Sequence, residues 1–454
     1  MLQIKNLNVI HKKDNRTLIE NFSFTLHEGE KAAIIGEEGN GKSTLLKLIY
    51  GEELVEEYVE YTGEIIKNGH KIGYLPQELE EKDKEKTVYE YCSERPMFYC
   101  VTPKEQAMIA RKLSISPELF YSDQLLKTLS GGERIKIQIA CLLMESADLF
   151  FFDEPSNDID METLIWLEEF LKETKTPVLY ISHDEILLEH TANTIIHMEQ
   201  IKRKTVSKIT VARCGYAEYV ESRGLLLDKQ EQIARKERSE YRKQQEKFQR
   251  IAQKVNHQQN TISRQDPHGG QLLKKKMHAV KAQEKRFQKN FENMTEIPDT
   301  EDAILLKFKP EIRIPNGKIL LDYKKEALCM EDQVLAKNLE LRVMGAEKIC
   351  IIGKNGVGKS TMLKEIAGQL LARKDIKAYY MPQNYEEELP LLETPVEFLT
   401  QTGEKAEQVR IRTFLGSMKY TADEMQHAIL HLSGGQKAKL LFVKMVLCGC
   451  NVLI

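Results

Sequence analysis

Residues 36–44 form the stretch Gly36-Glu-Glu-Gly-Asn-Gly-Lys-Ser-Thr44. An apolar run, 32–35, precedes it and a helix-forming run, 45–49, follows it, which predicts a strand, a loop and a helix in that order. Glycines let backbone N–H groups turn inward around phosphate oxygens, and the helix N-terminus adds a favourable dipole. The stretch therefore predicts a loop that binds a nucleoside triphosphate through Gly36, Gly39, Gly41, Lys42, Ser43 and Thr44, with Ser43 also facing Mg²⁺.

Three further predicted strands end in polar residues that suit the same chemistry. One strand ends at Gln77, and a second, Asp148-Leu-Phe-Phe-Phe152, is followed by Asp153 and Glu154. A third strand, 177–181, leads to Ser182 and His183. A carboxylate at the end of an apolar strand suits Mg²⁺, and its neighbour is placed to take a proton from water. A single Gln or His after a strand is more often a surface or structural residue, so Gln77 and His183 gain meaning only from the whole set.

A serine-glycine-glycine motif precedes the predicted helix 134–144, within Leu129-Ser-Gly-Gly-Glu133. Serine at this position is a good N-cap and could be only that. Because the first-turn amides of a helix also attract anions, the motif could equally be a second phosphate cradle.

Taken together and in this order, the motifs resemble those of the ATP-binding cassette superfamily, in which the serine-glycine-glycine motif is the signature. The resemblance implies that Gln77 senses Mg²⁺ and the attacking water, and that Asp153 holds Mg²⁺ through water. It implies that Glu154 is the general base and that His183 contacts the γ-phosphate. Asp160 is then expected in the loop that links two ATP sites.

The same series of motifs recurs about 300 residues downstream. The phosphate loop, the glutamine and the signature recur at offsets of 317, 306 and 303 residues, and residues 348–352 predict the strand before the second phosphate loop. A match of whole motif sets predicts two homologous domains in one chain. The second set comprises Gly353, Gly356, Gly358, Lys359, Ser360, Thr361, Gln383, Ser433, Gly434, Gly435 and Gln436, with Ser360 and Gln383 also facing Mg²⁺.

In the superfamily, ATP is held between the phosphate loop of one cassette and the signature of the other. The resemblance implies one composite site from the first phosphate loop, its strand-end residues and residues 432–436. The other composite site pairs the second phosphate loop and Gln383 with Ser130, Gly131, Gly132 and Glu133. The 303-residue offset places the second pair of carboxylates at positions 456 and 457, so we expect a C-terminally truncated second cassette, two bound ATP molecules and one hydrolytic site.

Length and composition indicate a globular protein with more than one domain. The chain has 454 residues, of which 41% are hydrophobic and 30% charged, and no apolar run approaches the roughly 18 residues of a membrane span. Its eight cysteines include no Cys-x-x-Cys pair, which favours a reduced, cytoplasmic protein with incidental thiols.

A basic segment separates the two predicted cassettes. Apolar residues recur every seven positions from Leu227 to Ile262 and again from Leu273 to Met294, with Asp266-Pro-His-Gly-Gly270 between the two runs. This spacing predicts a long helical hairpin with its tip near 260–270. From Lys229 to Lys289 there are 17 Lys and Arg against 6 Asp and Glu, although the chain as a whole carries −3. This excess of positive charge fits either a segment that binds a polyanionic partner or a solvated spacer. The rest of the chain favours the polyanionic partner.

Two cassettes in tandem around a basic hairpin resemble the ABC-F subfamily over essentially the whole length. Residues 153–160, Asp-Glu-Pro-Ser-Asn-Asp-Ile-Asp, are similar to its Asp-Glu-Pro-Thr-Asn-His-Leu-Asp pattern, with Ser156 and Asp158 as departures. The resemblance implies an ATPase that uses ATP and Mg²⁺ and acts on the ribosome, either in translation or in antibiotic resistance. The hairpin would reach the P-site tRNA and peptidyl-transferase region, with candidate RNA contacts at Arg264, Lys274, Lys275 and Lys276.

The predicted architecture is α/β, with two tandem P-loop cassettes joined by an antiparallel helical hairpin. We expect the first cassette at 1–221, the hairpin at 222–296 and the incomplete second cassette at 297–454. We also expect a monomer whose cassettes pair head to tail, without a membrane domain. The alternative is the soluble ATPase subunit of a transporter.

Overall fold

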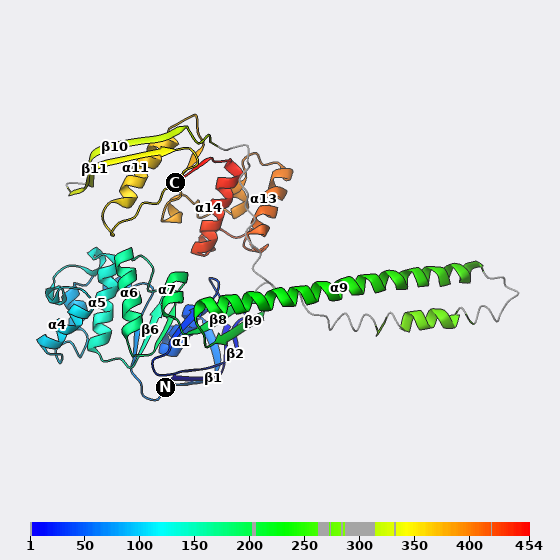
Figure 1. Cartoon of the computed structure of the whole chain (residues 1–454), viewed down its shortest axis with the longest axis horizontal. Helices are drawn as coiled ribbons and strands as arrows, with labels where there is room; N and C mark the ends of the chain where they lie inside the picture. The colour runs from blue at the N-terminus through cyan, green and yellow to red at the C-terminus, as the bar shows by residue number, and fades with distance from the viewer. Residues whose placement is uncertain are drawn as a thin grey trace.

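The computed structural model describes residues 2–201, 206–261, 272, 274–282, 285–286, 314–330, 333–418 and 420–454. Two α/β copies lie one above the other, and a long helix projects sideways from the first copy (Figure 1). We call the domain that contains the first phosphate loop the first copy and the domain that contains the second phosphate loop the second copy.

The first copy is built around a six-stranded sheet with the order β5-β6-β7-β3-β8-β9. All neighbouring strands run parallel except β8 and β9, which are antiparallel. A second, antiparallel sheet has the order β2-β1-β4. The strands are β1 (Leu2–His11), β2 (Arg16–Leu26), β3 (Lys31–Ile35), β4 (Val59–Ile66), β5 (Ile72–Leu75), β6 (Leu149–Asp153), β7 (Val178–Ile181), β8 (Thr194–Gln200) and β9 (Val206–Ala212).

Apolar residues cover both faces of the six-stranded sheet. On β6, Phe150 and Phe152 belong to one core cluster, whereas Leu149 and Phe151 belong to the other. Since successive side chains of a strand point to opposite faces, an unbroken apolar run is what a fully covered strand requires. The helices of this copy are α1 (Lys42–Tyr50), α2 (Glu81–Lys84), α3 (Val88–Ser93), α4 (Pro103–Lys112), α5 (Gly131–Met144), α6 (Met161–Glu173) and α7 (Glu185–Thr191), with short 3₁₀ turns at 52–54, 117–121 and 126–128.

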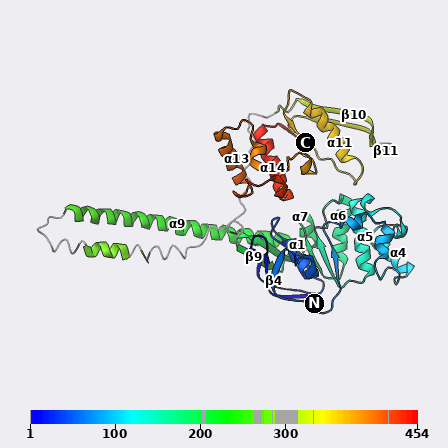
Figure 2. The same cartoon turned by 180° about the vertical axis from the view of Figure 1, so that it is seen from behind.

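The projecting helix α9 (Tyr216–Thr261) confirms the first helix of the predicted hairpin. Along its seven-residue seam, Ala234 and Val255 are buried, and Tyr241 and Phe248 are half-buried. Helical residues 274–282 lie beside the far half of α9, as both views show (Figures 1 and 2). The predicted tip, Arg264, and the seam positions Leu273, Phe287 and Met294 lie outside the described residues. The expected boundary at residue 222 falls inside α9.

Side chains at the base of α9 fix it to the sheet of the first copy. Nδ1 of His197, on β8, lies 2.8 Å from the hydroxyl of Tyr219. The guanidinium of Arg223 donates from both terminal nitrogens to the carboxylate of Glu199, at 2.5 and 3.0 Å. Two-point contacts between Arg and a carboxylate fix direction as well as distance. The base of α9 therefore has a defined orientation on β8.

The attachment of α9 to β8 is expected to contribute less to the stability of the fold at acidic pH. Burial, aided by the charge of Arg223, lowers the pKa of His197 from 6.5 to about 4. The unfolded chain therefore binds an extra proton between these values, and stability falls as the pH drops from 6.5 towards 4. In urea unfolding over this range, the wild type is expected to lose about 2 to 3 kcal/mol relative to a His197→Gln variant. Parallel pH profiles of the two proteins would contradict this assignment.

The second copy contains fewer paired strands. An antiparallel hairpin of β10 (Ile319–Met330) and β11 (Gln333–Met344) packs near α11 (Lys359–Leu371), and β12 (Ala378–Tyr379) pairs with β13 (Val452–Leu453) in parallel. Ala378 pairs with Val452 just as Ile72 pairs with Leu149 in the first copy. These pairs obey the predicted offsets of 306 and 303 residues, so the repeat holds at the level of strand register. The remaining helices are α12 (Pro395–Leu399), α13 (Lys405–Ser417) and α14 (Gly434–Cys448), with 3₁₀ turns at 385–387 and 429–431.

The predicted strand at 348–352 is wrong. These residues are irregular, and Ile352 is 80% exposed. In the first copy, the equivalent β3 is held between β7 and β8. No described strand of the second copy pairs with residues 348–352. An apolar run without neighbours on either side leaves its backbone groups unpaired, so it does not form a strand.

Candidate nucleotide-binding and hydrolysis site

Four neighbouring parallel strands of the first copy bring the predicted motifs to one edge of the sheet. The order β5-β6-β7-β3 places Gln77, Asp153 with Glu154, His183 and the phosphate loop after adjacent strand ends. Ligands of open α/β sheets bind in this position, outside the carboxyl ends of the strands. The structure therefore brings together the residues that the sequence places far apart.

The first phosphate loop adopts a conformation that depends on its glycines. Gly36, Gly39 and Gly41 have positive φ angles of 147°, 76° and 89°. A Cβ on Gly36 would lie 2.2 Å from the backbone oxygen of Met198, so the loop cannot accept a larger residue there. Gly41 is the N-cap of α1, whose first-turn amides face the loop.

The side chain of Lys42 is hydrogen-bonded to the backbone of its own phosphate loop. Its Nζ donates to the carbonyl oxygens of Gly36 and Glu37, at 2.8 and 2.9 Å. Burial lowers the pKa of Lys42, while the nearby carboxylates of Glu154 and Glu38 oppose that shift. The lysine is thus held at the centre of the site with its charge facing several acids.

Asp153 lies next to the hydroxyl of Ser43. Ser43 Oγ donates to Oδ1 of Asp153 at 2.9 Å, and the Tyr74 hydroxyl donates to Oδ2 at 3.4 Å. Burial raises the pKa of Asp153, although the Ser43 hydrogen bond works in the other direction. Tyr74 was not predicted as a site residue, and its position three residues before Gln77 was the available signal.

Three side chains surround the carboxylate of Glu154. Gln77 Nε2 and Asn157 Nδ2 donate to Oε2 at 3.2 and 2.6 Å, and His183 Nε2 lies 3.7 Å from Oε1. Glu154 has φ of 50°, in the left-handed region that is costly for a residue with a Cβ. The strain and the surrounding donors hold the carboxylate in one orientation. Asn157 was missed by the sequence prediction, although it lies within the quoted 153–160 run.

The environment of His183 disfavours its charged form. Burial lowers its pKa, and the positive charge of Lys42 lowers it further. A neutral imidazole can donate from one nitrogen and accept at the other. The neutral side chain can therefore donate one hydrogen bond to an oxygen such as that of a phosphate.

Both signatures act as helix N-caps in this structure. Glu133 N donates to Ser130 Oγ at 3.2 Å, and Gln436 N donates to Ser433 Oγ at 3.3 Å. The side chain of the third residue of each helix accepts a hydrogen bond from the serine amide, which makes both motifs capping boxes. The capping role is thus confirmed, and the amides of the first two helical residues have no partner within the helix.

The second phosphate loop repeats the geometry of the first. Gly353, Gly356 and Gly358 have φ of 158°, 78° and 97°, and Gly358 is the N-cap of α11. Lys359 Nζ donates to the carbonyl oxygens of Gly353 and Lys354, at 2.8 and 2.7 Å. Ser360 and Gln383 are exposed, and Thr361 is half-buried.

The two copies contact each other through the predicted motifs. Asn355, in the second phosphate loop, donates from Nδ2 to the carbonyl oxygen of Asp158 at 2.8 Å and from its backbone N to Asp160 at 3.4 Å. A Cβ on Gly131, in the first signature, would lie 2.1 Å from the Asp158 oxygen and 3.5 Å from Asn355 Nδ2. The second phosphate loop therefore faces the first signature.

The reciprocal contact is also present. A Cβ on Gly435, in the second signature, would lie 2.2 Å from Oε2 of Glu38 in the first phosphate loop. Lys354 adds an exposed ion pair with Glu162 at 2.6 Å, which contributes little by itself. Loop and signature meet in both directions, and this is the head-to-tail arrangement that the sequence predicted.

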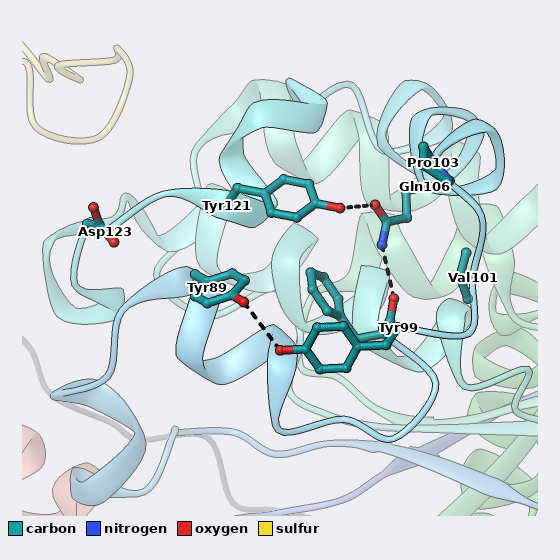
Figure 3. Close-up of a pocket in the computed structure, with 8 residues that line it drawn as sticks. Tyr89, Tyr99, Val101, Pro103, Gln106, Tyr121 and Asp123 are labelled. Carbon is teal, nitrogen blue, oxygen red and sulfur yellow. Dashed lines mark hydrogen bonds between the residues drawn. The ribbon is translucent and has the colours of Figure 1, made fainter.

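A separate cavity of about 520 Å³ lies in the helical part of the first copy. Figure 3 shows the hydroxyls of Tyr89 and Tyr99 pointing toward one another and the Tyr121 hydroxyl pointing to Gln106. No residue of either phosphate loop lines this cavity. The nucleotide chemistry belongs to the sheet edge instead.

Comparison with known proteins agrees with this geometry. The family model described as ABC transporter matches residues 19–157 and 336–454. The chain belongs to the ATP-binding cassette family. The two matched regions are ATPase domains of this type, so each copy is a cassette, which confirms the predicted α/β tandem fold.

Relatives of the chain include members of the ABC transporter F family. ABC transporter F family member 5 of Arabidopsis thaliana is 26% identical, over 96% of this chain and 66% of its own length. Ribosome protection protein VmlR of Bacillus subtilis is 27% identical, over 98% and 77%. The probable ATP-binding protein YheS of Escherichia coli is 27% identical, over 97% and 69%. The chain thus spans 66% to 77% of the length of these relatives.

Among its described helices, none has the length and hydropathy to cross a bilayer.

Proposed function

We propose that ATP binding closes the two cassettes around two composite sites, and that closure directs the basic hairpin to ribosomal RNA. Hydrolysis then reopens the cassettes and releases the ribosome. The head-to-tail contacts of Asn355 with Asp158 and Glu38 with Gly435 support the composite sites. In this arrangement ATP would lie between each phosphate loop and the opposite signature.

The residues around Glu154 support hydrolysis at the first phosphate loop. The Glu154 carboxylate would accept the proton of the attacking water, since Gln77 and Asn157 hold its Oε2 atom in place. Lys42 would release its loop carbonyls and pair with the β- and γ-phosphates. His183 would hold a γ-phosphate oxygen, and the amides of the second signature would face the same phosphate.

The residues present also fit a Mg²⁺ ion. The Ser43 hydroxyl and the Asp153 carboxylate, which are hydrogen-bonded to each other, are the oxygen donors that Mg²⁺ prefers. A bound cation would favour the charged form of Asp153, which burial alone disfavours. Ser43 would bind the ion directly, and Asp153 and Gln77 would hold it through water. When bound, Mg²⁺ neutralises charge on the phosphates. Ser360 and Gln383 are the corresponding candidates of the second loop.

The projecting helix is the observation that carries the ribosomal proposal. Its 46 residues correspond to about 69 Å, well beyond both cassettes (Figure 1). Positive charge is concentrated in the distal half. Residues 242–261 have five Lys or Arg and one acid, and residues 274–286 have six and one. Structured RNA is bound largely through phosphates and shape, which a stiff basic rod can match.

The name of the relative VmlR supports a ribosomal partner for this chain as well. We propose that the hairpin reaches the P-site tRNA and the peptidyl-transferase region, with Arg264 and Lys274 to Lys276 among its RNA contacts. The role would be that of a translation factor or of an antibiotic-protection protein. The protein would act as a cytoplasmic monomer.

Sedimentation with ribosomes tests this proposal. A Glu154→Gln variant, in which ATP turnover is expected to be slow, is expected to pellet with ribosomes in the presence of Mg-ATP and to stay in the supernatant with ADP. The same sedimentation is carried out with membrane vesicles in place of ribosomes. Recovery with vesicles and absence from the ribosomal pellet would overturn the proposal and favour the ATPase subunit of a transporter.

A further inference from the structure

The two phosphate loops share a backbone geometry but differ in charge. Both lysines donate to the carbonyl oxygens of the first two loop residues, at nearly equal distances. Residues 36–42, however, include Glu37, Glu38 and Lys42, whereas residues 353–359 include Lys354 and Lys359. Their formal charges are therefore −1 and +2. Because the phosphate chain of ATP is itself negative, the first loop is electrostatically the poorer receptor.

The third residue of each loop contacts the opposite cassette in a different way. Asn355 donates hydrogen bonds to Asp158 and Asp160 and brings no carboxylate of its own to the first signature, where the backbone oxygen of Asp158 lies against Gly131. Glu38, at the equivalent position, has its carboxylate against Gly435 instead. A Cβ there would lie 2.2 Å from Oε2 and 2.9 Å from the carboxyl carbon. Only glycine at this position admits the carboxylate so closely.

Gly435 is the second residue of α14, which runs for 15 residues. Amides of the first helical turn have no partner within the helix, and the helix dipole favours an anion beside them. The carboxylate of Glu38 thus lies against the first turn of α14, at the second glycine of the second signature. Lys42 and His183 are close enough for their charges to interact with Glu38.

We infer that Glu38 sets the ATP affinity of the first phosphate loop, because its carboxylate competes with the terminal phosphate for the second signature. The two composite sites are consequently unequal. The loop with Asn355 is the tighter ATP site, and the loop with Glu38 is the weaker one and also the one that contains the general base. This inference rests on the composite sites proposed above.

Calorimetric titration of the full chain with Mg-ATP tests it, in a Glu154→Gln background in which turnover is expected to be slow. The background protein is expected to show two classes of site about tenfold or more apart. Glu38→Asn, which copies the second loop, is expected to tighten the weak class about tenfold and to leave the tight class within about twofold. Added KCl should reduce the difference in ATP affinity between the two sites of the background protein, because salt screens the repulsion between the Glu38 carboxylate and the phosphates.

The reciprocal variant is Asn355→Glu, which is expected to weaken the tight class. Glu38→Gln keeps the size of the side chain and removes only its charge, so it distinguishes an effect of charge on ATP affinity from an effect of side-chain shape. It also replaces Glu38→Asn if that variant does not fold. Unchanged or weaker binding at the weak class in folded Glu38→Asn or Glu38→Gln would overturn the inference. A background protein that binds no ATP would instead contradict the composite sites themselves.

Discussion

Replacement of Glu154 by Gln is expected to lower the ATP turnover rate by about 100- to 10,000-fold, the usual contribution of a general base. The amide keeps the shape of the carboxylate and can still contact Gln77 and Asn157, but it cannot accept a proton from water. Steady-state phosphate release measures this effect. ATP affinity, measured by titration, is expected to persist because the phosphate loop is untouched.

Glu173→Gln is the matched control for this variant. Glu173 is exposed at the end of α6, in the same cassette but outside the sheet edge that forms the site. Its removal is expected to leave turnover unchanged. If Glu154→Gln retained wild-type turnover, the proton acceptor would have to be another group, and the arrangement of Gln77, Asn157 and His183 around Glu154 would be structural.

The second large effect concerns the basic patch beside the distal half of α9. Reversal of Lys274, Lys275 and Lys276 to Glu is expected to weaken ribosome binding by about 100-fold or more at low salt. Each lysine that contacts a phosphate releases about one counterion, so the slope of log affinity against log salt should fall by about 2 to 3. Ribosome sedimentation at graded KCl concentrations measures both quantities.

Three exposed lysines of the first cassette, Lys13, Lys104 and Lys175, provide the control triplet. Reversal of these residues changes the net charge of the protein by the same amount. It is expected to alter the salt slope much less, since they lie away from the hairpin. Equal slopes for the two triplets would show that affinity follows net charge and that the 274–276 patch does not contact RNA.

Much of the fold follows from local pattern in the sequence. The apolar run before Asp153 predicts a strand that is covered on both faces, and the seven-residue spacing predicts α9. Both are local consequences of side-chain period, which does not depend on distant partners. The run at 348–352 has the same local pattern as β3, yet it is not a strand. Pairing with neighbours on both sides decides the outcome, and that information is not contained in the run itself.

The first site could be predicted as a set of residues but not as a set of contacts. Strand-end positions identify Asp153, Glu154 and His183. Tyr74 and Asn157 become recognisable only when the strands are side by side, because an isolated polar residue near a motif is common on any surface. The contrast between Asn355 and Glu38 is visible in the sequence. Its meaning depends on the opposite cassette, which no local pattern supplies.

The attachment of α9 has a mechanical consequence. Its base is fixed by Tyr219 and Arg223 to β8, the strand directly beside β3, which leads into the phosphate loop. A rod of about 69 Å turns small rotations into large displacements. A tilt of about 5° at β8 would move its far end by about 6 Å. A small rotation of β8 would therefore appear as a much larger displacement at the far end of α9.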